Sequence, residues 1–211
     1  MTSAEVKNPQ RRDMLQITID VPEHLRDSAF EEELLQFRMR LRVNITEMRW
    51  LFRLALHEGS HLRYMRAAGQ ECTLLGPRVE YRDGEFCWIH GSVVSKRERE
   101  YTYEFMLNTF KEFLVGALAV EILTGEANDE SKEGDVQRAC ACLEMSRDEA
   151  ACWLCVAEGE LREELQNPVV VGEVLEAARE YARTIFGDDA CVAWGVKIYR
   201  LDRHVRGTQE S

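Results

Sequence analysis

The sequence predicts a mainly α-helical protein with a small antiparallel β-sheet, and three observations lead to this α+β fold class. Apolar residues recur at helical spacing over residues 44–68 and again over 98–123. Between these stretches lie short runs typical of strands, and the Asp83-Gly84 pair between two of them predicts a tight hairpin. Hydrophobic residues make up 45% of the 211 residues, which is enough for a sizeable core.

The N-terminal part of the chain holds three segments. Residues 1–13 are polar and are expected to form a disordered tail. Residues 14–21 alternate as in a short strand before Pro22, and residues 28–42 have the pattern of a charged amphipathic helix. No linker or internal repeat divides the chain after the tail, so residues 14–211 are predicted to form a single domain.

The helix predicted over residues 44–68 has signals at both ends. Asn44 can cap its first turn, and Glu47 stands three residues later, as in a capping box. Gly69 can end the helix in the left-handed conformation. The apolar residues at helical spacing are Ile45, Met48, Leu51, Phe52, Ala55, Leu62 and Met65.

Short runs with strand character follow this helix and predict the small sheet. They cover residues 72–75, 78–82, 85–90 and 92–95.

The next predicted helix, over residues 98–123, ends at Gly125. A polar loop over residues 126–134 follows it. Asp135 can then cap a helix that runs to about residue 145.

The remainder of the chain is also predicted to be helical. Helices are expected over residues 147–165 and 169–186, and Pro168 opens the second of them. Residues 190–201 fit a strand or a helix equally well.

Charge and cysteine content exclude several classes of protein. The net charge of −11 argues against a nucleic-acid partner, because phosphate binding needs a basic surface. No run of about 18 apolar residues could span a bilayer, and the N-terminus lacks the apolar core of a signal peptide. Seven cysteines, an odd number at scattered positions, indicate reduced thiols rather than a disulfide scaffold. These observations together predict a cytoplasmic protein.

The motif His57-Glu58-Gly59-Ser60-His61 carries the chemistry. Histidines four residues apart on a helix present both imidazoles on one face, within reach of a single metal ion. Glu58 points to a different side of the helix and can accept a proton from a water molecule on the metal, as the catalytic base. This pattern is typical of zinc hydrolases, in which the metal lowers the pKa of that water to about 7.

A hydrolytic zinc site needs a third protein ligand, and a fourth position stays open for water. A carboxylate from the later helix and its acidic loop is favoured, because the residue six positions after His61 is Ala67 rather than a third histidine. Spacing alone selects none of the candidates, which are Glu121, Asp129, Glu130, Asp135, His24, His90 and His204.

Three segments resemble the peptidase domain of FtsH-type zinc proteases, the peptidase part of membrane-bound ATP-dependent proteases. The run ALHEGSH at residues 55–61 is similar to the ALHEAGHA segment of that family. Residues 116–126 resemble its GGRAAEELIFGE helix, and residues 135–139 resemble its SNDLQRAT segment. The matches occur in the family's order and cover roughly residues 48–145.

The resemblance implies a zincin-like, FtsH-peptidase-like helical domain. Its recognisable core covers about residues 44–145, and residues 146–211 form a helical C-terminal part.

It also implies a role for each site residue. His57, His61 and Asp135 would hold Zn2+, and Glu58 would be the base. Glu121 would orient a histidine ligand from behind.

The predicted function is that of a zinc metalloendopeptidase acting on peptides or unfolded protein segments. The family carries an ATPase module and usually transmembrane helices, but no GxxxxGK[ST] phosphate loop occurs in this sequence. Hydrolysis would therefore be independent of ATP, and a separate ATPase or adaptor would deliver folded substrates. A homo-oligomer is expected from the resemblance. The alternative is a non-catalytic interaction or scaffold protein that retains the fold with a structural metal.

Simpler roles exist for several of these residues. Glu121 could pair with an arginine such as Arg138, and Asp135 could act only as a helix cap. His90 could stabilise an oxyanion or could simply end a strand in solvent. The cysteines at positions 140, 142, 152 and 155 could offer metal-binding thiols, but their predicted helices favour small buried core residues.

Overall fold

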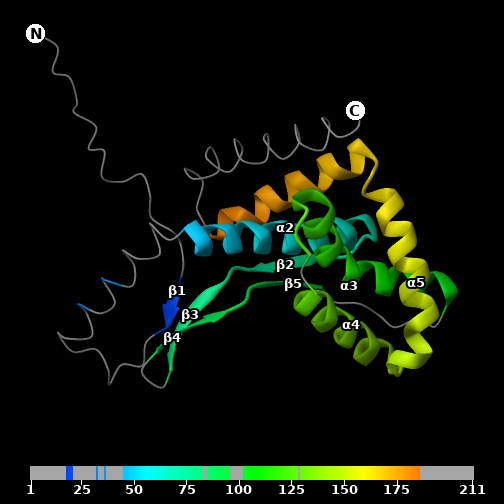
Figure 1. Ribbon diagram of the computed structural model, residues 1–211, viewed down its shortest axis with the longest axis horizontal. Helices are drawn as coiled ribbons and strands as arrows, with labels where there is room; N and C mark the ends of the chain where they lie inside the picture. The colour runs from blue at the N-terminus through cyan, green and yellow to red at the C-terminus, as the bar shows by residue number, and fades with distance from the viewer. Residues whose placement is uncertain are drawn as a thin grey trace, which may run out of the picture.

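The computed structural model describes residues 18–20, 32, 36, 45–82, 85–95, 102–127 and 129–185. It confirms a mainly helical α+β architecture (Figure 1). The elements are β1 (Thr18–Asp20), α2 (Ile45–Ala67), β2 (Cys72–Leu75), β3 (Arg78–Arg82), β4 (Glu85–Ile89), β5 (Ser92–Ser95), α3 (Tyr103–Thr124), α4 (Asp129–Leu143), α5 (Arg147–Glu164) and a helix over residues 168–185.

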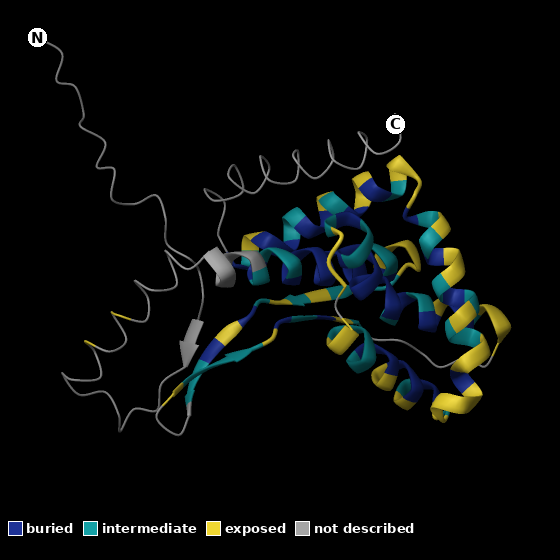
Figure 2. Ribbon diagram, viewed as in Figure 1, coloured by how far each residue is buried: buried dark blue, intermediate teal, exposed yellow. Residues whose placement is uncertain are grey.

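Helix α2 lies at the centre of the molecule. Residues 54–62 are all buried, and Figure 2 shows the buried residues gathered along α2 and α3. The helix over residues 168–185 runs along another side of α2 (Figure 1). Gly69 ends α2 with φ of 74°, as predicted, whereas the expected cap Asn44 lies outside the described residues. A helix buried on all sides supplies a core, so its few polar residues need partners inside the protein.

Helix α3 begins later than its apolar pattern predicts. The side chain of Thr102 caps it by accepting a hydrogen bond of 3.1 Å from the amide of Phe105. This cap sets the start at Tyr103 rather than at Glu98. The predicted end is confirmed, since Gly125 adopts φ of 73° and its amide donates to the carbonyl of Glu121.

Helix α4 begins within the stretch predicted to be a loop. It starts at Asp129, because Asp129 and Glu130 place negative charge where the helix dipole is positive. Asp135 therefore lies inside α4 and does not cap a helix, so that simpler role for Asp135 is wrong.

The later helices agree with their predictions. Ser146 caps α5 in a capping box with Glu149, and the next helix begins at Pro168. One prediction for these helices is wrong. Cys152 and Cys155 were expected in the core, but they are exposed on α5. Residues 190–201 and most of residues 28–42 lie outside the described part of the chain.

The strands form two small sheets instead of one. In the first sheet β3 pairs with β4 in antiparallel fashion, as the predicted hairpin requires, and with β1 in parallel fashion. In the second sheet β2 pairs with β5, with Leu74 opposite Val93. Gly76 and Pro77 separate β2 from β3, and Pro77 has no amide hydrogen with which to continue a ladder. The chain thus leaves one sheet before it enters the other.

No helix in the described ranges has the length and apolarity that a bilayer span requires.

Gly59 allows α2 and the helix over residues 168–185 to approach closely. A Cβ at this position would lie 2.3 Å from the Cα of Ala178, a backbone atom that cannot rotate away. By contrast, a Cβ at the exposed Gly159 of α5 would meet nothing within 4 Å.

These two glycines predict opposite effects of the same substitution. Gly59→Ala should lower the free energy of unfolding by about 1–3 kcal/mol, because overpacking against backbone outweighs the gain in helix propensity. Gly159→Ala should raise it by about 0.5–1 kcal/mol. Urea denaturation of both variants measures the difference, and a stabilised Gly59→Ala protein would contradict the packing described for α2.

Candidate metal centre

The structure brings three of the predicted site residues together in the core. His57 and His61 on α2 and Asp135 on α4 each offer one ligand atom, and these atoms lie within 4.8 Å of one another. All three residues are buried. Among the described residues, this is the group of metal-ligating side chains that could hold an ion.

The spacing of the ligand atoms fits a metal ion. The Nε2 atoms of His57 and His61 are 3.0 Å apart, and Nε2 of His57 is 3.3 Å from Oδ2 of Asp135. In a tetrahedral zinc site with bonds of 2.0–2.1 Å, neighbouring ligand atoms lie about 3.3 Å apart.

Both imidazoles are held so that Nε2 faces this space. Nδ1 of His61 lies 2.6 Å from the backbone carbonyl oxygen of Glu112, which can only accept a hydrogen bond. Nδ1 therefore carries the hydrogen, and Nε2 of the neutral ring keeps its lone pair. Ser131 on α4 lies near the other ring, with its Oγ 3.4 Å from Nδ1 of His57.

Glu112 also connects this site to the strands. Its carboxylate accepts a hydrogen bond of 2.8 Å from Nε2 of Gln70, just after α2. The amide oxygen of Gln70 in turn accepts a hydrogen bond from Ser95, at the end of β5. The residue whose carbonyl orients His61 is thus tied to β5 by its side chain.

Asp135 presents one oxygen that the protein itself leaves unsatisfied. Its Oδ1 accepts a hydrogen bond of 2.5 Å from Arg138, whereas its buried Oδ2 has no hydrogen-bond partner among the described residues. His57 is close, but burial, followed by the charges of His61 and Arg138, lowers the pKa of His57 well below its ordinary value. A neutral ring gives no ion pair. A cation between the rings and Oδ2 would satisfy all three atoms.

Gly116 on α3 makes the room for both rings. A Cβ at this position would lie 2.6 Å from Nε2 of His61 and 2.7 Å from Cε1 of His57. Only a glycine fits against the two imidazoles at this point, because a methyl group would occupy space next to the ligand nitrogen.

Glu58 lies beside the ligand group and is held by a strand. Its Oε2 accepts a hydrogen bond of 3.1 Å from the amide of Val93 in β5, and the residue is 8% exposed. Burial raises the pKa of Glu58, and the charge of His61 opposes this rise. A buried carboxylate with a raised pKa accepts protons more readily than an exposed one.

Glu121 does not join this group. Its carboxylate pairs with Arg162 of α5 at 2.8 Å, so its partner is an arginine, although not the expected Arg138. Glu121 follows Gly116 by five residues, which places it about 140° around α3 from the face that meets the imidazoles. The prediction that it orients a histidine is therefore not supported, since the two Nδ1 atoms face Glu112 and Ser131.

The other ligand candidates also lie elsewhere. Asp129 and Glu130 are exposed in the first turn of α4. His90 is exposed at the end of β4, where its ring packs edge-on against Trp50 with centroids 5.3 Å apart. His24 and His204 fall outside the described residues.

Sequence reasoning missed Glu112, Gly116, Ser131 and Arg138. A backbone acceptor such as the Glu112 carbonyl leaves no trace in the sequence, and the role of Gly116 depends on a contact between helices. Ser131 and Arg138 stand four residues before and three residues after Asp135, so they share its helix face. Placing the start of α4 correctly would have put Ser131 on this helix as well.

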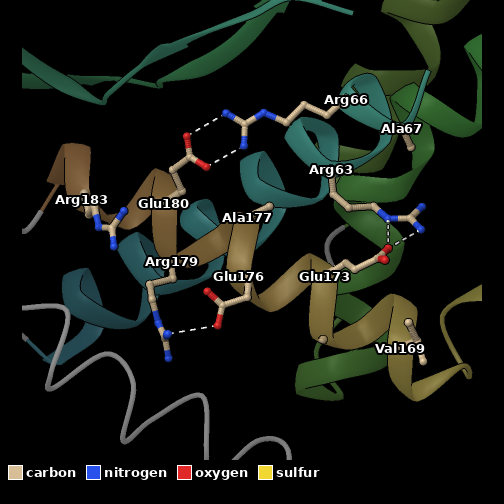
Figure 3. Close-up of a pocket in the computed structure, with 11 residues that line it drawn as sticks. Arg63, Arg66, Ala67, Val169, Glu173, Glu176, Ala177, Arg179, Glu180 and Arg183 are labelled. Carbon is tan, nitrogen blue, oxygen red and sulfur yellow. Dashed lines mark hydrogen bonds and ion pairs between the residues drawn. The ribbon is translucent and has the colours of Figure 1, made fainter. Parts of the chain in front are cut away.

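A surface groove of about 730 Å³ lies apart from these ligands, between α2 and the helix over residues 168–185 (Figure 3). Ion pairs join the two helices across it, at 2.7 Å between Arg63 and Glu173 and at 2.6 Å between Arg66 and Glu180. Its lining includes none of the metal-ligating residues.

No protein-family model matches the chain, and neither does any curated protein or solved structure. The likeness to FtsH-type proteases therefore rests on the short segments quoted above.

The role of Gly116 predicts that a single methyl group abolishes metal binding. Gly116→Ala should take up less than a tenth of the zinc bound by the wild-type protein, because the added carbon displaces the ligand imidazoles. Gly134→Ala is the matched control, since Gly134 precedes Asp135 and its Cβ would meet nothing within 4 Å. Elemental analysis after dialysis measures both, and full zinc content in Gly116→Ala would refute the geometry.

Burial of His57 predicts a pH dependence for the metal-free protein. Its pKa is lowered from 6.5 on folding, so the unfolded chain binds more protons between the folded-state pKa and 6.5. The free energy of unfolding should therefore rise with pH through this window, by up to about 1.4 kcal/mol per pH unit. The raised pKa values of Glu58 and Asp135 act in the opposite sense between their ordinary and folded-state values.

Denaturation at pH values from 4 to 8 in the presence of a chelator isolates the histidine. The stability gained by the wild type toward pH 7 should be smaller in His57→Gln, which has no imidazole to protonate. Equal pH profiles for His57→Gln and the wild type would show that His57 is not buried as a neutral ring.

Proposed function

We propose that this protein is a zinc-dependent metallopeptidase, which hydrolyses peptide bonds with an activated water molecule. The observation that carries the proposal is the buried group of His57, His61 and Asp135 with the carboxylate of Glu58 beside it. Two imidazoles and one carboxylate form a ligand set of hydrolytic zinc enzymes, and three protein ligands leave one position open.

A purely structural metal site would not need a proton acceptor such as the carboxylate of Glu58 beside the ligands. When bound, a zinc ion supplies Lewis-acid activation of a water molecule and of a substrate carbonyl. Proton transfer is left to the protein, and the Glu58 carboxylate would take a proton from the water and release it to the departing amine nitrogen. The hydrogen bond from Val93 fixes one carboxylate oxygen, which leaves the other to exchange protons.

Peptides and unfolded protein segments are the proposed substrates. Each of the three ligands and Glu58 is at most 8% exposed, so an extended chain fits this site better than the surface of a folded protein. The 211 residues contain no phosphate-loop motif, and unfolding of folded substrates would come from outside them, through a separate ATPase or an adaptor.

Glu58→Gln tests the proposal directly. The amide keeps the size of the side chain but cannot accept the proton, so cleavage of casein and of fluorogenic peptides should fall at least about 100-fold. Zinc content should remain at one ion per chain. Glu176→Gln, at a side chain that is 71% exposed, is the matched control and should cleave at the wild-type rate.

Two results would contradict this function. Zinc-loaded wild-type protein that cleaves no member of a broad peptide panel would favour a non-catalytic interaction protein. Purification with stoichiometric iron in place of zinc would point to a different chemistry, because two histidines and a carboxylate also form an iron site.

A further inference from the structure

We propose that Arg138 is a positioning residue of the metal centre, which binds Oδ1 of Asp135 so that only Oδ2 is offered to the metal. The inference rests on the metal centre of the proposed function but not on peptide hydrolysis. Nothing in the sequence motifs assigns this role, because most of the arginine side chain is exposed to solvent.

The contact itself distinguishes the two carboxylate oxygens. A guanidinium nitrogen of Arg138 lies 2.5 Å from Oδ1, three residues along the same helix. The carboxylate is 1% exposed, whereas the arginine side chain is 64% exposed. Oδ1 therefore has a charged donor, and Oδ2, which faces Nε2 of His57 at 3.3 Å, has none.

The difference between the two oxygens would determine how many coordination positions of a metal ion Asp135 occupies. A carboxylate that binds through both oxygens takes two coordination positions, so an ion that also kept its water molecule would be five-coordinate with His57 and His61. Binding through Oδ2 alone takes one position and leaves another for water, which hydrolysis requires. The hydrogen bond from Arg138 would keep Oδ1 away from the ion, so that the three protein ligands and one water molecule would form a four-coordinate shell.

Because Arg138 is positively charged, the affinity of the protein for the metal ion is a poor measure of the positioning role of Arg138. Its guanidinium favours the ionised form of Asp135, but it also repels a bound cation. Removing the arginine would relieve that repulsion while freeing Oδ1, and the two effects on affinity oppose each other. The number of coordinated atoms responds to only one of them.

A matched arginine exists on the neighbouring helix. Arg147 of α5 pairs with Glu133 of α4 at 2.6 Å, and its side chain is 58% exposed. This ion pair has nearly the same length as the pair of Arg138 with Asp135 and a similarly exposed arginine, but its carboxylate is 46% exposed and is not a metal ligand. Arg147→Met therefore removes an arginine that pairs with a carboxylate of α4 without touching the site.

The coordination number can be measured with Co2+ in place of zinc, because Co2+ absorbs visible light and Zn2+ does not. Four-coordinate cobalt absorbs more strongly than five-coordinate cobalt. The experiment loads the full chain with Co2+ and records the visible spectrum and thermal unfolding. We expect strong four-coordinate absorption from the wild type and from Arg147→Met. Arg138→Met should show the weaker five-coordinate spectrum, and Arg138→Lys, which retains a charged donor, should restore the wild-type spectrum.

Three outcomes would overturn the inference. The first is an unchanged spectrum from cobalt-loaded Arg138→Met, and the second is a five-coordinate spectrum from the wild type. The third is an Arg138→Met protein that unfolds at the wild-type temperature but binds no cobalt, because the arginine would then hold Asp135 in place rather than select an oxygen. Four-coordinate wild-type protein that cleaves no peptide would contradict the peptidase proposal and leave this inference intact.

Discussion

The close contact between α2 and α3 is the constraint on which the rest of the site depends. It places two imidazoles in the protein core, where each polar atom must find a partner. The glycine on α3 provides the space for the rings, and the Glu112 carbonyl and Ser131 meet their outer nitrogens. The inner nitrogens then face each other beside Oδ2 of Asp135, which has no hydrogen-bond partner among the described residues.

Folding this core without a metal carries an electrostatic cost. Burial raises the pKa of both Glu58 and Asp135, so their ionised forms are less stable in the folded protein than in water. It also keeps His57 uncharged, so this ring adds no positive charge to that of Arg138. Binding of a divalent cation would offset these costs, so folding and metal uptake would be coupled.

The sequence was sufficient for the parts of the site that depend on local pattern. The helix with His57, Glu58 and His61 and its end at Gly69 follow from spacing and from one glycine. The start of α4 was missed because an acidic, polar stretch resembles a loop until its charges are matched to a helix N-terminus. Glu121 was misplaced because its partner Arg162 comes from a helix distant in the sequence.

The sheets were predicted least well, because strand pairing is decided by distant contacts. The alternation of apolar and polar residues indicates each strand. Only the folded chain shows that β1 pairs with β3 and that β2 pairs with β5. The same limit applies to Asp135, whose place beside the histidines depends on how α4 packs and was expected only from a family resemblance.

Gly59 and Ser60, which lie between Glu58 and His61 in the motif, are not proposed ligands, yet packing constrains both of them. Ser60 satisfies its buried hydroxyl on the carbonyl of Leu56 at 2.7 Å, and Gly59 is pressed against the backbone of Ala178. The helix over residues 168–185 lies beyond the segments that resemble a known protease. A residue of the metal-binding motif is thus constrained by packing against a helix more than a hundred residues downstream. The motif therefore reflects the packing of α2 as well as the chemistry of the site.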